Sequence, residues 1–190
     1  LNKSIPKRVE QVVLKALADR EVRRECRPLI LGDWRVLQRT LRGKRYPFTL
    51  AARQPGEPIA KNDHAIPVYS LSTLSPDQSR PGHPSKACGE AVYQYIRAAV
   101  KLIRSGAADA MATAPINKKV LQLAGYRYPG HTELLAKLTR TRECRMMLLG
   151  ERLKVVLVTV HLPFRRVPRE INARRVRVTL ELTHRGLREW

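Results

Sequence analysis

Two short segments of the sequence combine residue types that could bind an anionic substrate. Asn117 and Lys118 follow the apolar stretch 109–114, and His131 and Thr132 stand at the start of a second helical pattern. Free amide groups at a helix N-terminus attract anions, and Lys and His side chains add hydrogen-bond donors. A phosphorylated small molecule is therefore one candidate ligand. The alternative is that Thr132 only caps its helix while His131 and Lys118 are solvated.

His161 is the candidate metal ligand. It directly follows the apolar segment 154–160, which would place its imidazole at the carboxyl end of a strand. Neutral imidazole is a common ligand of zinc and other borderline metals. A catalytic zinc usually takes three protein ligands, so a hydrogen-bonded structural histidine is the alternative. The histidines that show no companion ligand spacing are His64, His83 and His184.

Several common catalytic signatures are missing from the sequence. It contains no Gly-x-Gly-x-x-Gly, no Walker phosphate loop, no Gly-x-Ser-x-Gly and no His-Glu-x-x-His. These motifs mark dinucleotide, nucleotide, serine hydrolase and zinc protease sites. The chemistry suggested by the sequence therefore rests on the segments around Lys118, His131 and His161.

Alternating helices and strands must position these side chains. Apolar residues at helical spacing, together with caps such as Asp33, predict helices over 9–18, 34–41, 90–104, 116–123 and 132–139. Short apolar runs predict strands over 29–31, 48–51, 66–71, 109–114, 146–149 and 154–160. Residues 42–88 hold most of the prolines and are expected to be rich in loops.

The C-terminal segment fits two kinds of element. The alternation of Val176, Val178 and Leu180 is typical of a strand, but Pro168 followed by Glu170 signals the start of a helix. We predict a helix that begins at 167 and runs toward the C-terminus. The whole pattern favours an α/β fold, a layered and mostly parallel sheet with flanking helices.

The chain is strongly basic. Its 37 Lys and Arg against 16 Asp and Glu give a net charge of +21, which raises nucleic acid as a possible partner. The basic residues are scattered, however, with only short pairs such as Arg165-Arg166 and Arg174-Arg175, and aromatic residues make up 5% of the chain. Stacking platforms and a recognisable binding module are therefore absent, and we do not expect nucleic acid to be the partner.

Three separated cysteines, Cys26, Cys88 and Cys144, offer neither a disulfide framework nor a Cys-x-x-Cys zinc site. Isolated thiols fit a reducing compartment. The apolar runs are too short to span a membrane, and the first residues carry no apolar signal-peptide core. We therefore expect a cytoplasmic protein.

Four stretches resemble the 4-hydroxythreonine-4-phosphate dehydrogenase family in residue identity, order and spacing. They are 106–118, 124–135, 146–148 and 157–163. Segments 13–22 and 27–33 also resemble that family's opening helix and second strand. The resemblance covers most of 12–190 and is weak across 42–85. It implies a fold like that of isocitrate and isopropylmalate dehydrogenases, and a homodimer.

The resemblance also implies a reaction. In that family NAD or NADP oxidises a phosphorylated hydroxy-amino acid, which then loses carbon dioxide, in pyridoxal phosphate biosynthesis. A divalent metal (Zn, Mg or Co) takes part. On this mapping His131 and Thr132 bind the substrate, Lys118 adds a substrate-side contact, and His161 is one metal ligand.

The sequence departs from the family pattern in two places. Residues 1–11 diverge from the family's Gly-rich opening segment, and its Asn-Pro-His-Ala-Gly-Glu and Tyr-His-Asp-Gln motifs have no counterpart. We therefore expect residues 1–190 to correspond to the N-terminal part of such a dehydrogenase, truncated and inactive as an isolated chain. A non-catalytic remnant and, less in keeping with the sequence, a basic nucleic-acid-binding protein are the alternatives.

Overall fold

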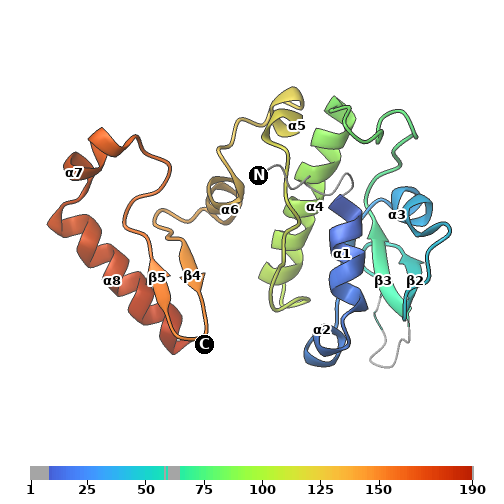
Figure 1. Cartoon of the computed structure of the whole chain (residues 1–190), viewed down its shortest axis with the longest axis horizontal. Coiled ribbons are helices and arrows are strands. Elements are labelled where there is room, and N and C mark those ends of the chain that lie inside the picture. Colours follow the sequence, from blue (N-terminus) through green and yellow to red (C-terminus); the bar gives the residue numbers. More distant parts are fainter. Residues whose placement is uncertain (1–8, 58, 60–64, 190) are drawn as a thin grey trace. The chain divides into compact units, whose positions relative to one another are not determined.

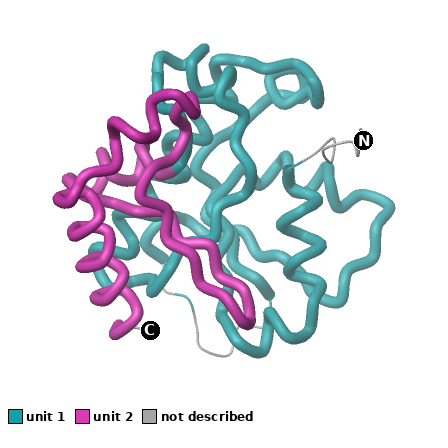
Figure 2. The backbone as a smooth tube through the Cα atoms, turned by 60° about the vertical axis from the view of Figure 1, so that its left-hand side comes forward, with its two compact units in different colours: residues 1–131 teal, residues 132–190 magenta. Residues whose placement is uncertain are grey.

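The computed structural model describes residues 9–57, 59 and 65–189 of the chain. The chain forms two compact units, residues 1–131 and residues 132–190, here called unit 1 and unit 2 (Figure 2). Each has its own elements and is described by itself.

A three-stranded parallel sheet is the centre of unit 1. Strands β1 (Ile30–Gly32), β3 (Ala65–Ser70) and β2 (Thr49–Arg53) lie in that order, and Ile30 pairs with Val68. The central strand β3 is buried along most of its length, as expected for a parallel strand covered on both faces. The predicted parallel sheet is confirmed, with strand ends shifted by one or two residues.

Helices α1 (Val9–Ala18), α3 (Trp34–Leu41) and α4 (Lys86–Arg104) lie beside this sheet (Figure 1). The core that α1 and α3 share with the strands consists of Leu14, Leu17, Ile30, Leu37, Ile66 and Val68. Because α1 and α3 present their apolar residues at helical spacing, their bounds agree with the prediction.

Asp33 joins α3 to the loop that follows β3. Its side chain is buried, at 4% exposure. One carboxylate oxygen accepts from the amide of Val36 at 2.9 Å, which caps α3 as predicted. The other accepts from the Ser72 hydroxyl at 2.8 Å and from the amide of Leu74 at 2.6 Å. The loop after β3 is therefore held against the start of α3.

Helix α4 begins four residues earlier than predicted, because the Ser85 hydroxyl accepts from the amide of Cys88 and caps it. It packs against α5 (Lys118–Leu123), where the rings of Tyr93 and Tyr126 stack at 3.8 Å. The Tyr126 hydroxyl donates to the Glu90 carboxylate at 2.8 Å. Burial, and then this hydrogen bond, raise the pKa of Tyr126 to about 12.

In unit 1, one predicted element is wrong and one helix was not predicted. Residues 109–114, predicted as a buried strand, form neither helix nor strand and are mostly exposed. Most of their side chains are small, and no described strand takes their backbone hydrogen bonds. Helix α2 (Arg20–Glu25) was not predicted, because it has no apolar face and buries no residue.

Unit 2 combines a short hairpin with helices. Helix α6 (His131–Thr139) begins at the last residue of unit 1, and β4 (Met147–Leu149) pairs antiparallel with β5 (Lys154–Val156). A 3₁₀ turn, η1 (Phe164–Arg166), then leads into the C-terminal helices.

The C-terminal segment is helical, as predicted, but it forms two helices in place of one. Helix α7 (Val167–Glu170) ends before Ile171, and Asn172 caps α8 (Ala173–Arg188) by accepting from the amide of Arg175 at 3.0 Å. An Asn side chain that bonds the amide three residues on favours a new helix start. Among the described residues, no helix combines the length and apolarity needed to cross a bilayer.

Candidate functional site

His131 and Thr132 form the first turn of α6. The sequence predicted that Thr132 caps this helix, but the helix begins one residue earlier and Thr132 lies within it. Gly130 therefore occupies the cap position, where it offers no side-chain oxygen. No side chain of the described residues accepts from the amides of this first turn, and such amides are favourable partners for an anion.

The imidazole of His131 combines burial with an unused hydrogen-bonding atom. Its Nε2 atom is buried and has no hydrogen-bond partner in the described part of the chain. Burial lowers the pKa of His131 below its ordinary value of 6.5, so the ring is neutral at physiological pH. A neutral imidazole can donate one hydrogen bond and accept another. A buried polar atom without a partner costs stability, which favours a ligand that supplies one.

Acidification is expected to destabilise the chain through His131. Above pH 6.5 the histidine is neutral in both states, but below it the unfolded chain takes up the proton first, because the folded pKa is lowered. The unfolding free energy measured in urea should therefore fall more between about pH 7.5 and about pH 5.5 in the wild type than in His131→Asn. Equal losses in the two proteins would contradict this role of burial.

Lys118 lies at a different helix start. It is the first residue of α5, it is exposed, and Asn117 caps the helix by accepting from the amide of Lys119 at 2.9 Å. No hydrogen bond or ion pair within the described ranges joins Lys118 to His131 or Thr132. His131 and Thr132 therefore share one helix turn, whereas Lys118 lies at the start of another helix.

His161 lies in a loop, since β5 ends at Val156 in place of the predicted 160. The partner strand β4 has only three residues, and the last hairpin bond joins the amide of Leu157 to Met146. His161 is exposed and has a left-handed backbone, with φ of 55°. That conformation is strained for most residues other than glycine, and such strain clusters at functional sites.

The described residues do not form a metal site. They contain no group of three or more His, Cys, Asp or Glu side chains placed to hold an ion. A single exposed imidazole fits one position of a metal that takes further ligands from elsewhere. His161 by itself therefore does not hold the implied divalent metal.

A groove of about 640 Å³ lies within unit 2 beside Thr132. The polar side chains along it include Thr132, Arg145, Thr159, Asn172, Arg174 and Arg175. Val160 and Leu162 line the same groove, which places the two neighbours of His161 on its wall. Glu133 and Glu143 line the groove as well, and Glu143 pairs with Arg145 at 3.1 Å, so the groove carries charges of both signs.

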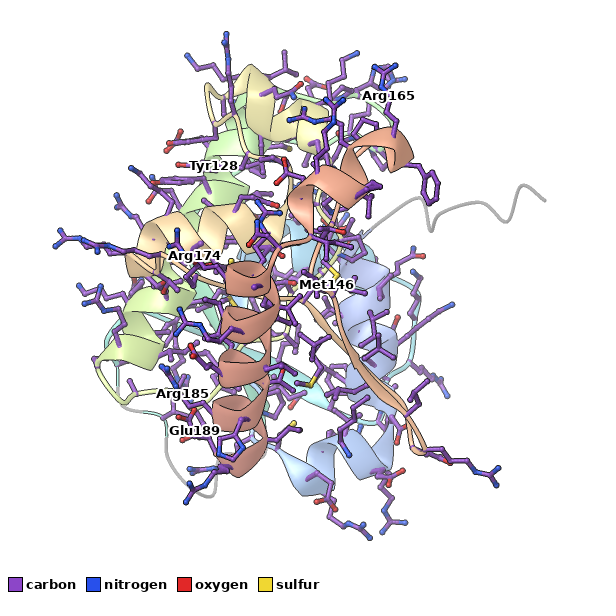
Figure 3. All side chains as sticks on the ribbon, turned by 90° about the vertical axis from the view of Figure 1, so that its left-hand side faces the viewer. Tyr128, Met146, Arg165, Arg174, Arg185 and Glu189 are labelled. Carbon is purple, nitrogen blue, oxygen red and sulfur yellow. The ribbon has the colours of Figure 1, made fainter. Side chains whose placement is uncertain are left out.

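The arginines of this groove were not predicted as site residues. Figure 3 shows Arg174 near the start of α8, and Arg175 pairs with Glu170 at 2.8 Å. Arg145 is held by the Thr179 hydroxyl at 2.9 Å. The Arg174-Arg175 pair was visible in the sequence, but only the fold of unit 2 places it near Thr132.

Residues 24–190 match the family described as pyridoxal phosphate biosynthetic protein PdxA. This chain belongs to that family. It is 43% identical over 178 residues to the 4-hydroxythreonine-4-phosphate dehydrogenase of Trichlorobacter lovleyi, covering 93% of this chain and 53% of that protein. It is 39% identical over 177 residues to the D-threonate 4-phosphate dehydrogenase of Cupriavidus necator, with the same two shares. The chain thus spans about half the length of the curated relatives it matches.

Solved structures of the family agree with this fold. The 4-hydroxythreonine-4-phosphate dehydrogenase of Burkholderia phymatum is 38% identical, with a TM-score of 0.79 over 90% of this chain and 52% of that one. The enzyme of Klebsiella pneumoniae is 33% identical, with a TM-score of 0.81 over 94% of this chain and 54% of that one. The predicted α/β dehydrogenase fold is therefore confirmed.

Proposed function

We propose that this chain supplies the substrate-binding half of a dehydrogenase that acts on a phosphorylated hydroxy acid. 4-Hydroxythreonine-4-phosphate is the first candidate and D-threonate 4-phosphate the second, since relatives carry both names. The observation that carries the proposal is the buried, unpartnered Nε2 of His131 beside the uncapped amides of α6.

Each residue of the site has a defined task in this proposal. The neutral imidazole of His131 bonds a polar group of the substrate, and the Thr132 hydroxyl adds a second bond. The amides of α6 favour the anionic end of the substrate. These groups bind and orient the substrate, which is the part of catalysis that positioning supplies.

The cofactors of the reaction are proposed from family membership. NAD or NADP would accept the hydride, and a divalent metal (Zn, Mg or Co) would stabilise charge that develops on the substrate oxygen. His161 would give that metal one ligand. Since the described residues offer no further ligand cluster, we expect no turnover by this chain alone. A homodimer is proposed for the complete enzyme, also from family membership.

Binding should therefore be separable from turnover. 4-Phosphohydroxy-L-threonine added to the chain is expected to shift and broaden its own ³¹P resonance, while no reduced cofactor appears at 340 nm. Each variant, His131→Ala and Thr132→Val, should weaken binding by roughly tenfold or more, the loss of one hydrogen bond to a charged ligand. His184→Ala, an exposed histidine of α8, is the matched control and should bind normally.

Two results would count against the proposal. If neither variant changes the ³¹P titration, the first turn of α6 does not bind the substrate, and a non-catalytic remnant becomes the better explanation. Binding of DNA or RNA that weakens steeply with salt would instead favour the nucleic-acid alternative.

A further inference from the structure

A cavity of about 250 Å³ lies in unit 1, where the strands of the parallel sheet end. Ser70 is the last residue of β3, Arg53 is the last residue of β2, and Trp34 follows closely after the end of β1. All three line this cavity. The carboxyl ends of the described parallel strands therefore meet at it, and this is the edge of an open α/β sheet where ligands bind.

The lining of the cavity is held in place by hydrogen bonds. The Ser70 hydroxyl accepts from the amide of Trp34 at 3.2 Å and donates to the carbonyl of Ser72 at 3.3 Å. The Ser72 hydroxyl in turn donates to the buried carboxylate of Asp33 at 2.8 Å. The indole of Trp34 packs against the core of unit 1 and is half-buried. A lining that is already ordered lowers the entropic cost of binding.

Two lining side chains have unused hydrogen-bonding groups. Arg35 is exposed and makes no ion pair or side-chain hydrogen bond with any described residue, and the hydroxyl of Thr73 has no partner there either. The other charged side chains of the lining are Arg53 and Glu57, so two guanidinium groups face one carboxylate. A guanidinium group beside a hydroxyl favours an oxyanion such as a phosphate or a carboxylate.

The ring of Trp34 and the size of the cavity restrict the ligand further. An aromatic surface favours a flat ring, which can stack on it. Pockets for drug-sized ligands span about 300–1,000 Å³, so a cavity of about 250 Å³ suits a ligand with a single ring. A dinucleotide such as NAD is too large to be its occupant.

We propose that this cavity binds a compact aromatic oxyanion, a ligand with one flat ring that carries a phosphate or a carboxylate group. The ring lies against Trp34, and the oxyanion accepts hydrogen bonds from Arg35 and Thr73. None of these residues belongs to the proposed substrate site at His131 and Thr132, so each site can fail its own test without affecting the other.

Tryptophan fluorescence of the full chain measures this binding. The sequence has two tryptophans, so Trp190→Phe leaves Trp34 as the only one. Phenyl phosphate and benzoate are the probes, because they share a ring and differ in the oxyanion. At least one of them should quench the fluorescence saturably, with a dissociation constant of about 1 mM or lower. Inorganic phosphate and phenol each lack half of the ligand and should bind at least about tenfold more weakly.

Arg35→Gln in the same background should weaken binding by about tenfold, through loss of a hydrogen bond between charged groups. Arg104→Gln is the matched control. Arg104 is the exposed last residue of α4 in the same unit, and its replacement lowers the net charge equally. The control should leave the dissociation constant unchanged. Circular dichroism should show that both variants fold like the Trp190→Phe chain.

Three outcomes would overturn the proposal. In the first, neither phenyl phosphate nor benzoate quenches Trp34 saturably. In the second, inorganic phosphate binds as tightly as phenyl phosphate, so the cavity holds an adventitious ion only. In the third, Arg35→Gln and Arg104→Gln weaken binding equally, which means that the net charge of the chain attracts the probe without a defined site.

Discussion

Gly89→Ala is expected to lower the melting temperature of unit 1 by about 10 °C. Gly89 is buried within α4, at the point where this helix crosses α5. A Cβ at this position would lie 2.7 Å from the Cβ of Ala124 and closer still to the backbone carbonyl oxygen of Val120. Because that oxygen belongs to the backbone of α5, the helices must move apart. Overpacking of this kind costs about 3 kcal/mol, enough for such a shift.

The direction of the change in melting temperature shows whether close packing or helix propensity dominates at Gly89. Alanine within a helix is favoured over glycine by about 1 kcal/mol, so propensity alone predicts stabilisation. Gly186 provides the matched control, because it lies in α8 and a Cβ there meets no atom within 4 Å. Gly186→Ala should therefore be neutral or raise stability by up to about 1 kcal/mol.

Thermal unfolding followed by circular dichroism measures both variants. If Gly89→Ala melts at or above the wild-type temperature, α4 and α5 do not approach as closely as described. The stacked rings of Tyr93 and Tyr126 lie in the same helix contact, so their near-ultraviolet signal should weaken in Gly89→Ala and persist in Gly186→Ala.

The sequence predicts elements well where local signals suffice. The bounds of α1 and α3 agree with the prediction, because an apolar stripe and the cap at Asp33 are both local properties. The close approach at Gly89 is different, since it depends on Val120 of α5 and on Ala124, which follows that helix. In the sequence, Gly89 is only a glycine that precedes a helical pattern, so the helix is predicted to begin after it.

The segment 109–114 was predicted as a strand that the structure does not contain. Its run of small apolar residues fits a buried strand, but a strand also needs a neighbour that takes its hydrogen bonds. The same reason shortens β5, whose described partner β4 has only three residues. Apolar content alone therefore overestimates strand length in this chain.

The residue types of the candidate site come from the sequence, and the structure adds their geometry. His131 and Thr132 do lie together at a helix start, but Thr132 does not cap it. His161 lies beyond its strand in a left-handed conformation that the sequence does not signal. Two of the groove arginines, Arg174 and Arg175, come from α8, far after Thr132 in the chain, and only the folded unit brings them near it. The roles of these residues remain predictions until binding is measured.

Asp33→Ala is expected to cost about 4 kcal/mol of the unfolding free energy. The substitution removes the acceptor for three donors at once: the amide of Val36, the amide of Leu74 and the hydroxyl of Ser72. Ser72 also bonds the hydroxyl of Tyr95, so it keeps one partner. The amides of Val36 and Leu74 keep no such partner, and a buried amide without an acceptor costs about 1–3 kcal/mol.

Asp19→Ala is the matched control, because Asp19 caps α2 through a single bond to the amide of Glu21 and is exposed. Loss of an exposed cap should cost about 1 kcal/mol or less. Urea unfolding of the two alanine variants therefore compares one cap with a cap that also fixes a loop.

The unfolding free energy of Asp33→Asn should fall between those of the two alanine variants, since its amide oxygen still accepts from Val36 while its nitrogen faces the amide of Leu74. If Asp33→Ala costs no more than Asp19→Ala, the bonds to Ser72 and Leu74 contribute nothing, and the loop after β3 must be held by its apolar contacts instead.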